Sequence, residues 1–196
     1  MTSDLVMVHQ GLRGTSVVVR AAGDRWTEDV HLLAFGREIG RVRNGYDGRT
    51  AWERLSFSAP APIDPYTTRA LVLEAIFDPF AADVSRYATA AITRSSAIDG
   101  TPVVVARFTT DWGAIITDSY DAKRWLLVRR ELELPIDADG QKLRESRRYS
   151  DWRKIRGTMI PHRIETDSVQ GKVIATVTAV ELDVDPDARV FAPPSE

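Results

Sequence analysis

Tyr149-Ser150-Asp151-Trp152-Arg153-Lys154-Ile155 opens the last third of the chain, and the turn residues Arg156-Gly157 follow it directly. Beyond the turn, Thr158–Asp167 and Lys172–Asp183 both have the composition of strands, and Gln170-Gly171 lies between them. Connections this short join antiparallel strands, because a parallel crossover needs a dozen or more residues. The stretch predicts consecutive antiparallel hairpins and no βαβ unit.

The last of these strands, Lys172–Asp183, is uncharged on both faces until Glu181. Alternate residues point to opposite sides of a strand, so each face can be read separately. One face carries Ile174, Thr176, Thr178, Val180 and Leu182, and the other carries Val173, Ala175, Val177 and Ala179. We therefore expect cover on both sides of this strand: a helix on one, and a cavity or second layer on the other.

The strand pattern extends over most of the chain. Asn44-Gly45-Tyr46-Asp47-Gly48 is dense in residues that tolerate positive φ and predicts a tight hairpin. Besides the helix described next, a second, weaker helical stretch is expected over Ala81–Ala91. The remaining predicted strands are 17–19, 30–35, 39–43, one beginning at Trp52, Val103–Thr109, Ala114–Tyr120, Trp125–Leu134 and Leu143–Ile155.

One strongly apolar helix interrupts the strands. Asp64 suits the N-cap and Pro65 the first turn, and Thr67–Asp78 then presents apolar side chains around nearly its whole circumference. Pro79 ends it. Such a helix must be covered on most sides, so we expect it against the concave face of the sheet. The predicted fold class is mainly β (α+β): one curved antiparallel sheet of roughly eight or more strands, covered by one or two helices.

Bulk composition excludes several classes of protein. The chain has 196 residues, a formal net charge of −2 and no cysteine. The length predicts a single domain over residues 1–196, and the charge gives no reason to bind nucleic acid. No window approaches the roughly 18 apolar residues of a membrane span, so no transmembrane segment is expected. Met1–Leu5 has no basic stretch followed by an apolar run, so no signal peptide is predicted.

No set of residues has the spacing of a catalytic or metal site. His9, His31 and His162 do not have metal-ligand spacing, and no Gly-x-Ser-x-Gly elbow occurs. Asp183-x-Asp185-x-Asp187 begins like a calcium loop, but Ala188 stands where the turn glycine belongs. We therefore expect no enzyme activity, no cofactor and no metal.

The five tryptophans leave two interpretations open. Trp26, Trp52, Trp112, Trp125 and Trp152 all fall on or beside predicted strands. Large aromatic rings fill protein cores, and they also line apolar pockets, where the indole N–H orients a ligand. The sequence does not separate core from pocket lining.

Several of these segments together resemble the bacterial lipoprotein-sorting carrier superfamily, the LolA/LolB type that includes LppX and LprG. Asn44–Trp52 resembles the family's DG-x-x-x-W hairpin, and Asp99-Gly100 resembles the glycine before its central strands. Tyr120–Leu127 is similar to its D-x-x-T-G-L-L turn, with Arg124 in place of the glycine. Ser150–Arg153, Gly157, Ile160-Pro161 and Phe191-Ala192-Pro193 resemble its C-terminal signature most closely.

The resemblance implies a curved β half-barrel whose helices cover an apolar cavity. It implies non-enzymatic binding or transport of a lipid, or of the acyl chains of a lipoprotein, in the periplasm or elsewhere outside the cytoplasmic membrane. Family members usually begin with a leader or lipid-attachment cysteine and a helix, which this sequence lacks. The alternative is a protein-interaction or sensing module with an envelope protein partner and no lipid cargo. The expected ligand-lining residues are Trp26, Phe35, Trp52, Leu73, Phe77 and Phe80.

Overall fold

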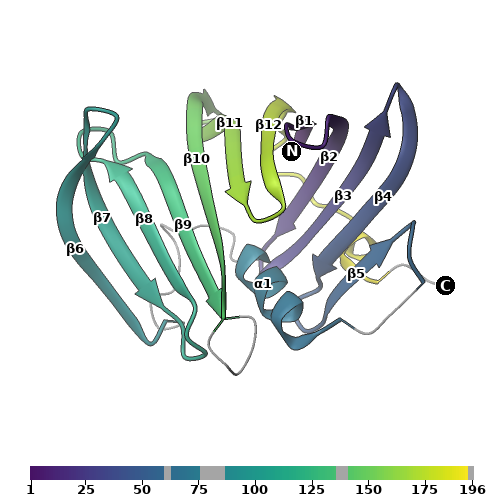
Figure 1. Ribbon diagram of the computed structural model, residues 1–196, viewed down its shortest axis with the longest axis horizontal. Helices are drawn as coiled ribbons and strands as arrows, with labels where there is room; N and C mark the ends of the chain where they lie inside the picture. Colours follow the sequence, from purple (N-terminus) through teal and green to yellow (C-terminus); the bar gives the residue numbers. More distant parts are fainter. Residues whose placement is uncertain (60–62, 76–86, 136–140, 194–196) are drawn as a thin grey trace. The chain divides into compact units, whose positions relative to one another are not determined.

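The computed structural model describes residues 1–59, 63–75, 87–135 and 141–193, without the side chains of 93–95. Phe77 and Phe80, the end of the expected helix and part of the expected second helix lie outside these ranges. Twelve strands form one sheet in the order β5-β4-β3-β2-β1-β12-β11-β10-β9-β8-β7-β6 (Figure 1). The strands are β1 (Thr2–Met7), β2 (Leu12–Ala21), β3 (Arg25–Ala34), β4 (Arg37–Tyr46), β5 (Ala51–Leu55), β6 (Thr89–Ile98), β7 (Thr101–Thr109), β8 (Ile115–Asp121), β9 (Leu127–Pro135), β10 (Lys142–Ile155), β11 (Thr158–Ser168) and β12 (Gly171–Ala179).

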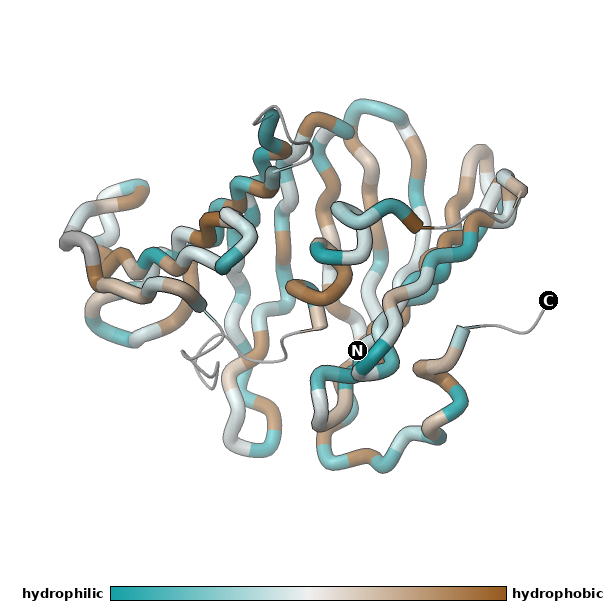
Figure 2. The backbone as a smooth tube through the Cα atoms, turned by 90° about the horizontal axis from the view of Figure 1, so that it is seen from below, coloured by the Kyte–Doolittle hydropathy of each residue, from teal (hydrophilic) through white to brown (hydrophobic). Residues whose placement is uncertain are grey.

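The antiparallel sheet confirms the predicted fold class. Within the runs β1 to β5 and β6 to β11, each strand pairs antiparallel with the next along the chain. Hydrophilic and hydrophobic residues alternate along much of the backbone (Figure 2), as expected for strands whose two faces differ in exposure. One α-helix, α1 (Pro65–Ala75), and a short 3₁₀ helix, η2 (Ala188–Phe191), complete the elements described.

The expected second helix is wrong for those of its residues that the structure describes. Thr89, Ala90 and Ala91 belong to β6, and they pair with Thr109, Phe108 and Arg107 of β7. Pairing with a neighbouring strand overrides the weak helical preference of these small residues, because strand propensity depends on tertiary context. Thr2–Met7 likewise forms a strand, β1, that the sequence pattern did not indicate.

The hairpin expected at Asn44–Gly48 is displaced along the chain. Asn44, Gly45 and Tyr46 are the last residues of β4, and the turn follows at 47–50. Asp47 holds the turn through its carboxylate oxygen, which accepts bonds from the backbone N–H groups of Arg49 (2.8 Å) and Thr50 (2.7 Å). Gly45 is in a strand for a packing reason: a Cβ there would lie 2.6 Å from the Trp26 carbonyl oxygen.

Two compact units divide the chain: residues 1–82 with 175–196, and residues 83–174. In the first unit, α1 packs on β3, β4 and β5, and Trp26, Leu71 and Ala75 form its buried cluster. In the second unit, the largest contributions to the core come from strands β7 to β9, with the buried residues Val103, Val105, Ile116, Tyr120, Leu127, Leu132 and Leu134.

The β12 strand is covered on one face and not on both. Val177 is buried, whereas Thr176 and Thr178, which point the other way, are exposed. The expectation of cover on each side of this strand is therefore wrong. Threonine occurs on both solvated and covered strand faces, so the absence of charge in this segment did not show which face of the strand is covered.

Candidate functional site

The candidate site is the face of the first unit's sheet that α1 covers. Trp26 pairs with Tyr46 on the neighbouring strand, and Tyr46 pairs with Ala51 on the next. Residues directly opposite in antiparallel strands share a face, so these three side chains lie side by side. Leu71 and Ala75 of α1 pack on Trp26, and Val18, Tyr46, Ala51 and Ile63 surround the cluster. The result is an apolar layer between one helix and four strands.

Trp26 is the central residue of this layer. Its side chain is 3% exposed, and its indole Nε1 is a buried donor without a hydrogen-bond partner. The guanidinium of Arg20 lies 5.7 Å from the centre of the ring, within reach of a cation–π attraction. A buried N–H without an acceptor costs about 1–3 kcal/mol, so an acceptor brought to it by a ligand gains that much.

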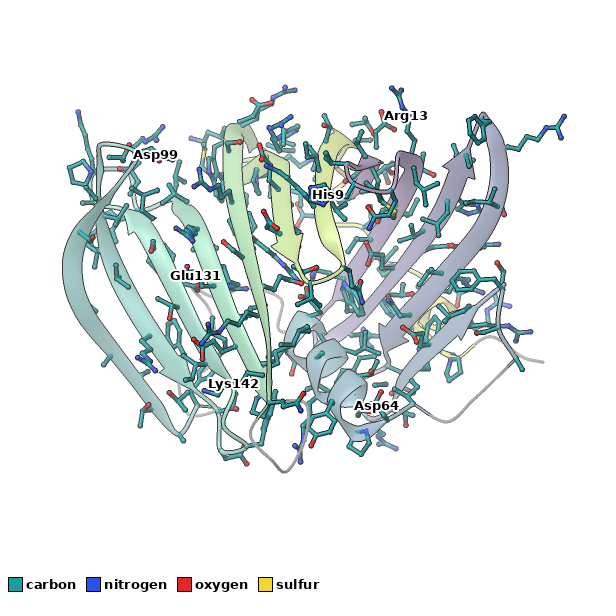
Figure 3. The ribbon with its side chains drawn as sticks, viewed as in Figure 1. His9, Arg13, Asp64, Asp99, Glu131 and Lys142 are labelled. Carbon is teal, nitrogen blue, oxygen red and sulfur yellow. The ribbon has the colours of Figure 1, made fainter. Side chains whose placement is uncertain are left out.

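Polar contacts fix both ends of α1. At the N-terminus, the Asp64 carboxylate accepts bonds from the backbone N–H of Tyr66 (2.8 Å) and Thr67 (3.0 Å) and from the Thr67 hydroxyl (2.6 Å) (Figure 3). These bonds, first that from the hydroxyl, lower the pKa of Asp64. Near the C-terminus, Arg20 donates to the Glu74 carbonyl oxygen and lies 3.8 Å from the Glu74 carboxylate. The helix is thereby anchored to β2 at its far end.

A row of polar side chains lies beside the apolar layer on the same face. Glu28 pairs with Asn44, and Asn44 pairs with Glu53, so the three cross β3, β4 and β5 in register. Ser16 donates to Glu28 at 2.7 Å. The Oδ1 atom of Asn44 is a buried acceptor without a partner. Partial burial, with the nearby Asp64 carboxylate, raises the pKa of Glu53.

Trp52 lies on the opposite face of the sheet from Trp26. It pairs with Gly45, the neighbour of Tyr46 along β4, and adjacent residues of a strand point to opposite faces. The indole Nε1 of Trp52 donates to the carbonyl oxygen of Phe191 in η2 at 2.8 Å, and the ring is 5% exposed. Trp52 is therefore packed beneath η2 and does not contribute to the layer under α1.

Of the other expected lining residues, Leu73 lies on α1 and is half-buried. Phe35 is fully exposed, at 106%, in the β3–β4 turn, where its φ is 50°. Of the expected lining residues that the structure describes, Trp26 alone belongs to the apolar layer. Leu73 is two residues from Leu71, about 200° around α1 from the buried face, and Phe35 lies elsewhere. Leu71, Tyr46 and Asn44 were not among the residues expected here, although Leu71 and Ala75 are four residues apart and therefore share one face of the helix.

A groove in the other unit is highly charged. Its volume is about 700 Å³, and most of its lining side chains belong to β9, β10 and β11, with Lys172 from β12 (Figure 3 labels Glu131). Its charges are internally compensated, as between Arg129 and Glu131 at 2.7 Å and between Lys172 and Glu165 at 2.7 Å. Hydrogen bonds from Lys172 and Arg163 lower the pKa of Glu165. Such a surface is unsuited to an apolar ligand.

Two absences hold for the described part of the chain alone. Among those residues, no group of three or more His, Asp or Glu side chains is arranged to hold a metal ion. None of the helices that the structure describes is long and apolar enough to cross a membrane.

Solved structures place this architecture in a known class. The structure is similar to that of a LolA superfamily protein from Nitrosomonas europaea, with a TM-score of 0.64 and 14% sequence identity. The match covers 98% of this chain and 88% of that one. A domain named for outer membrane lipoprotein sorting, from Vibrio parahaemolyticus, matches with a TM-score of 0.59 and 10% identity, covering 97% of this chain and 86% of that one. A DUF1329 family protein from Desulfovibrio piger matches equally well, with a TM-score of 0.59, 10% identity, and 97% and 87% coverage.

The protein thus has the LolA-like fold, as the sequence resemblance predicted. No protein-family model and no curated protein sequence matches the chain. At identities of 10–14%, the structural likeness establishes the fold and leaves the function to be argued from the site.

Proposed function

We propose that this protein binds an apolar ligand without catalysis, a lipid or the acyl chains of a lipoprotein, on the sheet face that α1 covers. The observation that carries the proposal is the environment of Trp26: a large buried ring under an apolar helix, with an indole N–H that has no acceptor. Apolar area provides affinity of roughly 25 cal/mol per Å², and one polar atom orients the ligand.

The attachment of α1 supports the proposal, because a ligand enters this layer only if the helix moves. Only Leu71 and Ala75 of the described helix residues are buried. A buried leucine contributes about 1.5–3 kcal/mol, and a partly exposed ion pair such as Arg20–Glu74 contributes at most about 1 kcal/mol. A ligand that replaces these contacts can compensate for their loss.

The LolA-like fold also supports the proposal, since one matching structure is named for lipoprotein sorting. On this basis we propose a location in the bacterial envelope, outside the cytoplasmic membrane, and an acylated lipoprotein or free lipid as the partner. Carriage of a ligand requires no nucleophile or cofactor, so we propose no catalytic residue.

Native mass spectrometry with lipid extraction, followed by titration with a fluorescent fatty acid, tests this function. We expect the purified protein to bind the fatty acid, and Leu71→Asp to weaken binding at least tenfold because a carboxylate would lie in the apolar layer. Arg69→Asp, on the exposed side of the same helix, is the matched control and should bind as the unmodified protein does. A protein that carries no lipid and does not bind the fatty acid refutes the proposal.

A protein-interaction module is the second candidate, and a specific surface favours it. Phe35 and Ile39 are 106% and 52% exposed around the β3–β4 turn, and Phe57, which approaches the same strand at Gly40, is 60% exposed. Trp26 and Trp52 do not contribute to that surface, because both are buried. If this candidate is right, a double variant Phe35→Ser, Ile39→Ser loses an envelope protein partner in cross-linking, and the purified chain binds no lipid.

A further inference from the structure

We propose that the ligand under α1 carries a group that both accepts and donates a hydrogen bond, with the secondary amide of an N-acyl chain as the chemical class, and that Trp26 and Asn44 bind this group. The inference rests on the proposed function and narrows it. It separates amide-linked acyl chains from the ester-linked chains of ordinary glycerolipids.

Two buried atoms of complementary type carry the inference. Trp26 Nε1 is a donor and Asn44 Oδ1 is an acceptor, and both are buried without a partner. Native proteins satisfy nearly all buried polar atoms, so each such atom calls for an explanation. A donor and an acceptor left unpaired on one face have a common explanation if a single ligand group satisfies both.

The strand register places the two side chains close together. Trp26 pairs with Tyr46, and Asn44 lies two residues before Tyr46 on the same strand. Such diagonal neighbours share a face, with their Cα atoms about 7–8 Å apart, within reach of large side chains. Both therefore border the same part of the α1-covered layer, where Leu71 and Ala75 supply the apolar cover.

The chemistry of the ligand follows from this pair. The N–H and C=O of a trans amide point in opposite directions, so the carbonyl can accept from the indole while the N–H donates to the Asn44 oxygen. An ester of the same length keeps the carbonyl and lacks the N–H, so it leaves the Asn44 acceptor unsatisfied. An unmade hydrogen bond in a buried site reduces affinity about 3- to 10-fold.

Two probes that differ only in this group test the inference: N-methyldodecanamide and methyl dodecanoate, each titrated against bound fluorescent fatty acid. We expect the unmodified protein to bind the amide about 3- to 10-fold more tightly than the ester. Asn44→Leu should abolish the preference, and Asn44→Asp, which keeps an acceptor, should retain it. Trp26→Phe, which keeps an aromatic ring and removes the donor, should weaken both probes by a similar factor. Trp125→Phe is the control, because Trp125 is 58% exposed in a turn of the other unit.

Failure of the inference and failure of the proposed function give different results. Equal affinity for the two probes in the unmodified protein, or a preference that survives Asn44→Leu, overturns the amide assignment and leaves an apolar site. No displacement by either probe, together with no binding of the fluorescent fatty acid, overturns both. Thermal unfolding of each variant identifies any that has lost its fold, and for Asn44→Leu the comparison is repeated with Asn44→Ala.

Discussion

Replacing Asp118 by alanine should destabilise the protein by about 3 kcal/mol. Asp118 is 0% exposed, and its carboxylate accepts two bonds from Arg130, each 2.8 Å, and one from the Tyr120 hydroxyl at 3.0 Å. Burial lowers the pKa of Arg130, but its bonds to Asp118 outweigh burial, so the pKa lies above its ordinary value. The substitution leaves a guanidinium without its counter-ion in the second unit.

The magnitude follows from the burial of the two partners. Removing one partner of a fully buried ion pair costs about 3–5 kcal/mol. The Arg130 side chain retains 21% exposure and can be partly solvated, which places the expected cost at the lower end. Against a total stability of about 5–15 kcal/mol, the loss is large enough to shift a urea midpoint by about 1.5 M.

Urea unfolding followed by circular dichroism measures this cost, and two variants give it a scale. Glu131→Ala is the matched control: Glu131 binds Arg129 at 2.7 Å, but the side chains are 48% and 31% exposed, so the expected loss is below about 1 kcal/mol. The double variant Asp118→Leu, Arg130→Met should recover most of the stability, because it leaves no buried charge. If Asp118→Ala costs no more than Glu131→Ala, the burial of the Asp118–Arg130 pair does not set its contribution to stability.

Two further predictions concern the first unit. Gly45→Ala should destabilise the protein by about 1–3 kcal/mol in the same urea assay, because its Cβ would lie 2.6 Å from the Trp26 carbonyl oxygen and 2.9 Å from the Trp52 ring; an unchanged midpoint would contradict this packing. Asp64→Ala should cost about 1 kcal/mol through loss of the α1 N-cap. Because folding lowers the pKa of Asp64, the stability that its carboxylate contributes is present above about pH 4 and declines as the pH falls through the folded-state pKa. The difference in unfolding free energy between Asp64→Ala and the unmodified protein should therefore narrow below about pH 4. A difference that stays constant with pH would argue against a role of the carboxylate.

The sequence predicted the hairpins where turn chemistry and strand composition agreed. The Arg156-Gly157 and Gln170-Gly171 turns lie between the expected strands, and the carboxylate cap at Asp64 is present. The strand β6 was missed because Thr89–Ile98 is rich in Ser and Ala, and β1 was missed because Thr2–Met7 is short and begins with the polar residues Thr2, Ser3 and Asp4. Those residues acquire strand structure only by pairing with β2 and β7, which local composition does not encode.

The candidate site was harder to predict because it depends on register. Trp26 and Trp52 were expected to line one cavity, yet they lie on opposite faces of the sheet. That separation is decided by where β4 ends: a hairpin beginning at Asn44 and one beginning after Tyr46 give different pairings. A shift of one residue exchanges the faces of a strand, so a small error in the turn became a large error in the site.

The same register accounts for the unusual composition of β4. Asn44 and Gly45 are turn-forming residues, yet both lie within β4, directly before its last residue Tyr46, and both pair with β3 and β5. Glycine is the only residue type that fits at position 45, between the Trp26 carbonyl oxygen and the Trp52 ring, since any Cβ would overlap both. Asn44 brings an acceptor to the face that α1 covers, where an apolar strand residue would have packed without an unsatisfied atom. The turn preference of these two adjacent residues was thus overruled: at Gly45 by packing against Trp26 and Trp52, and at Asn44 in the position that we assign to ligand binding. Conflicts of this kind are expected at functional sites. Substitution of Asn44 is therefore the most direct test of the binding hypothesis.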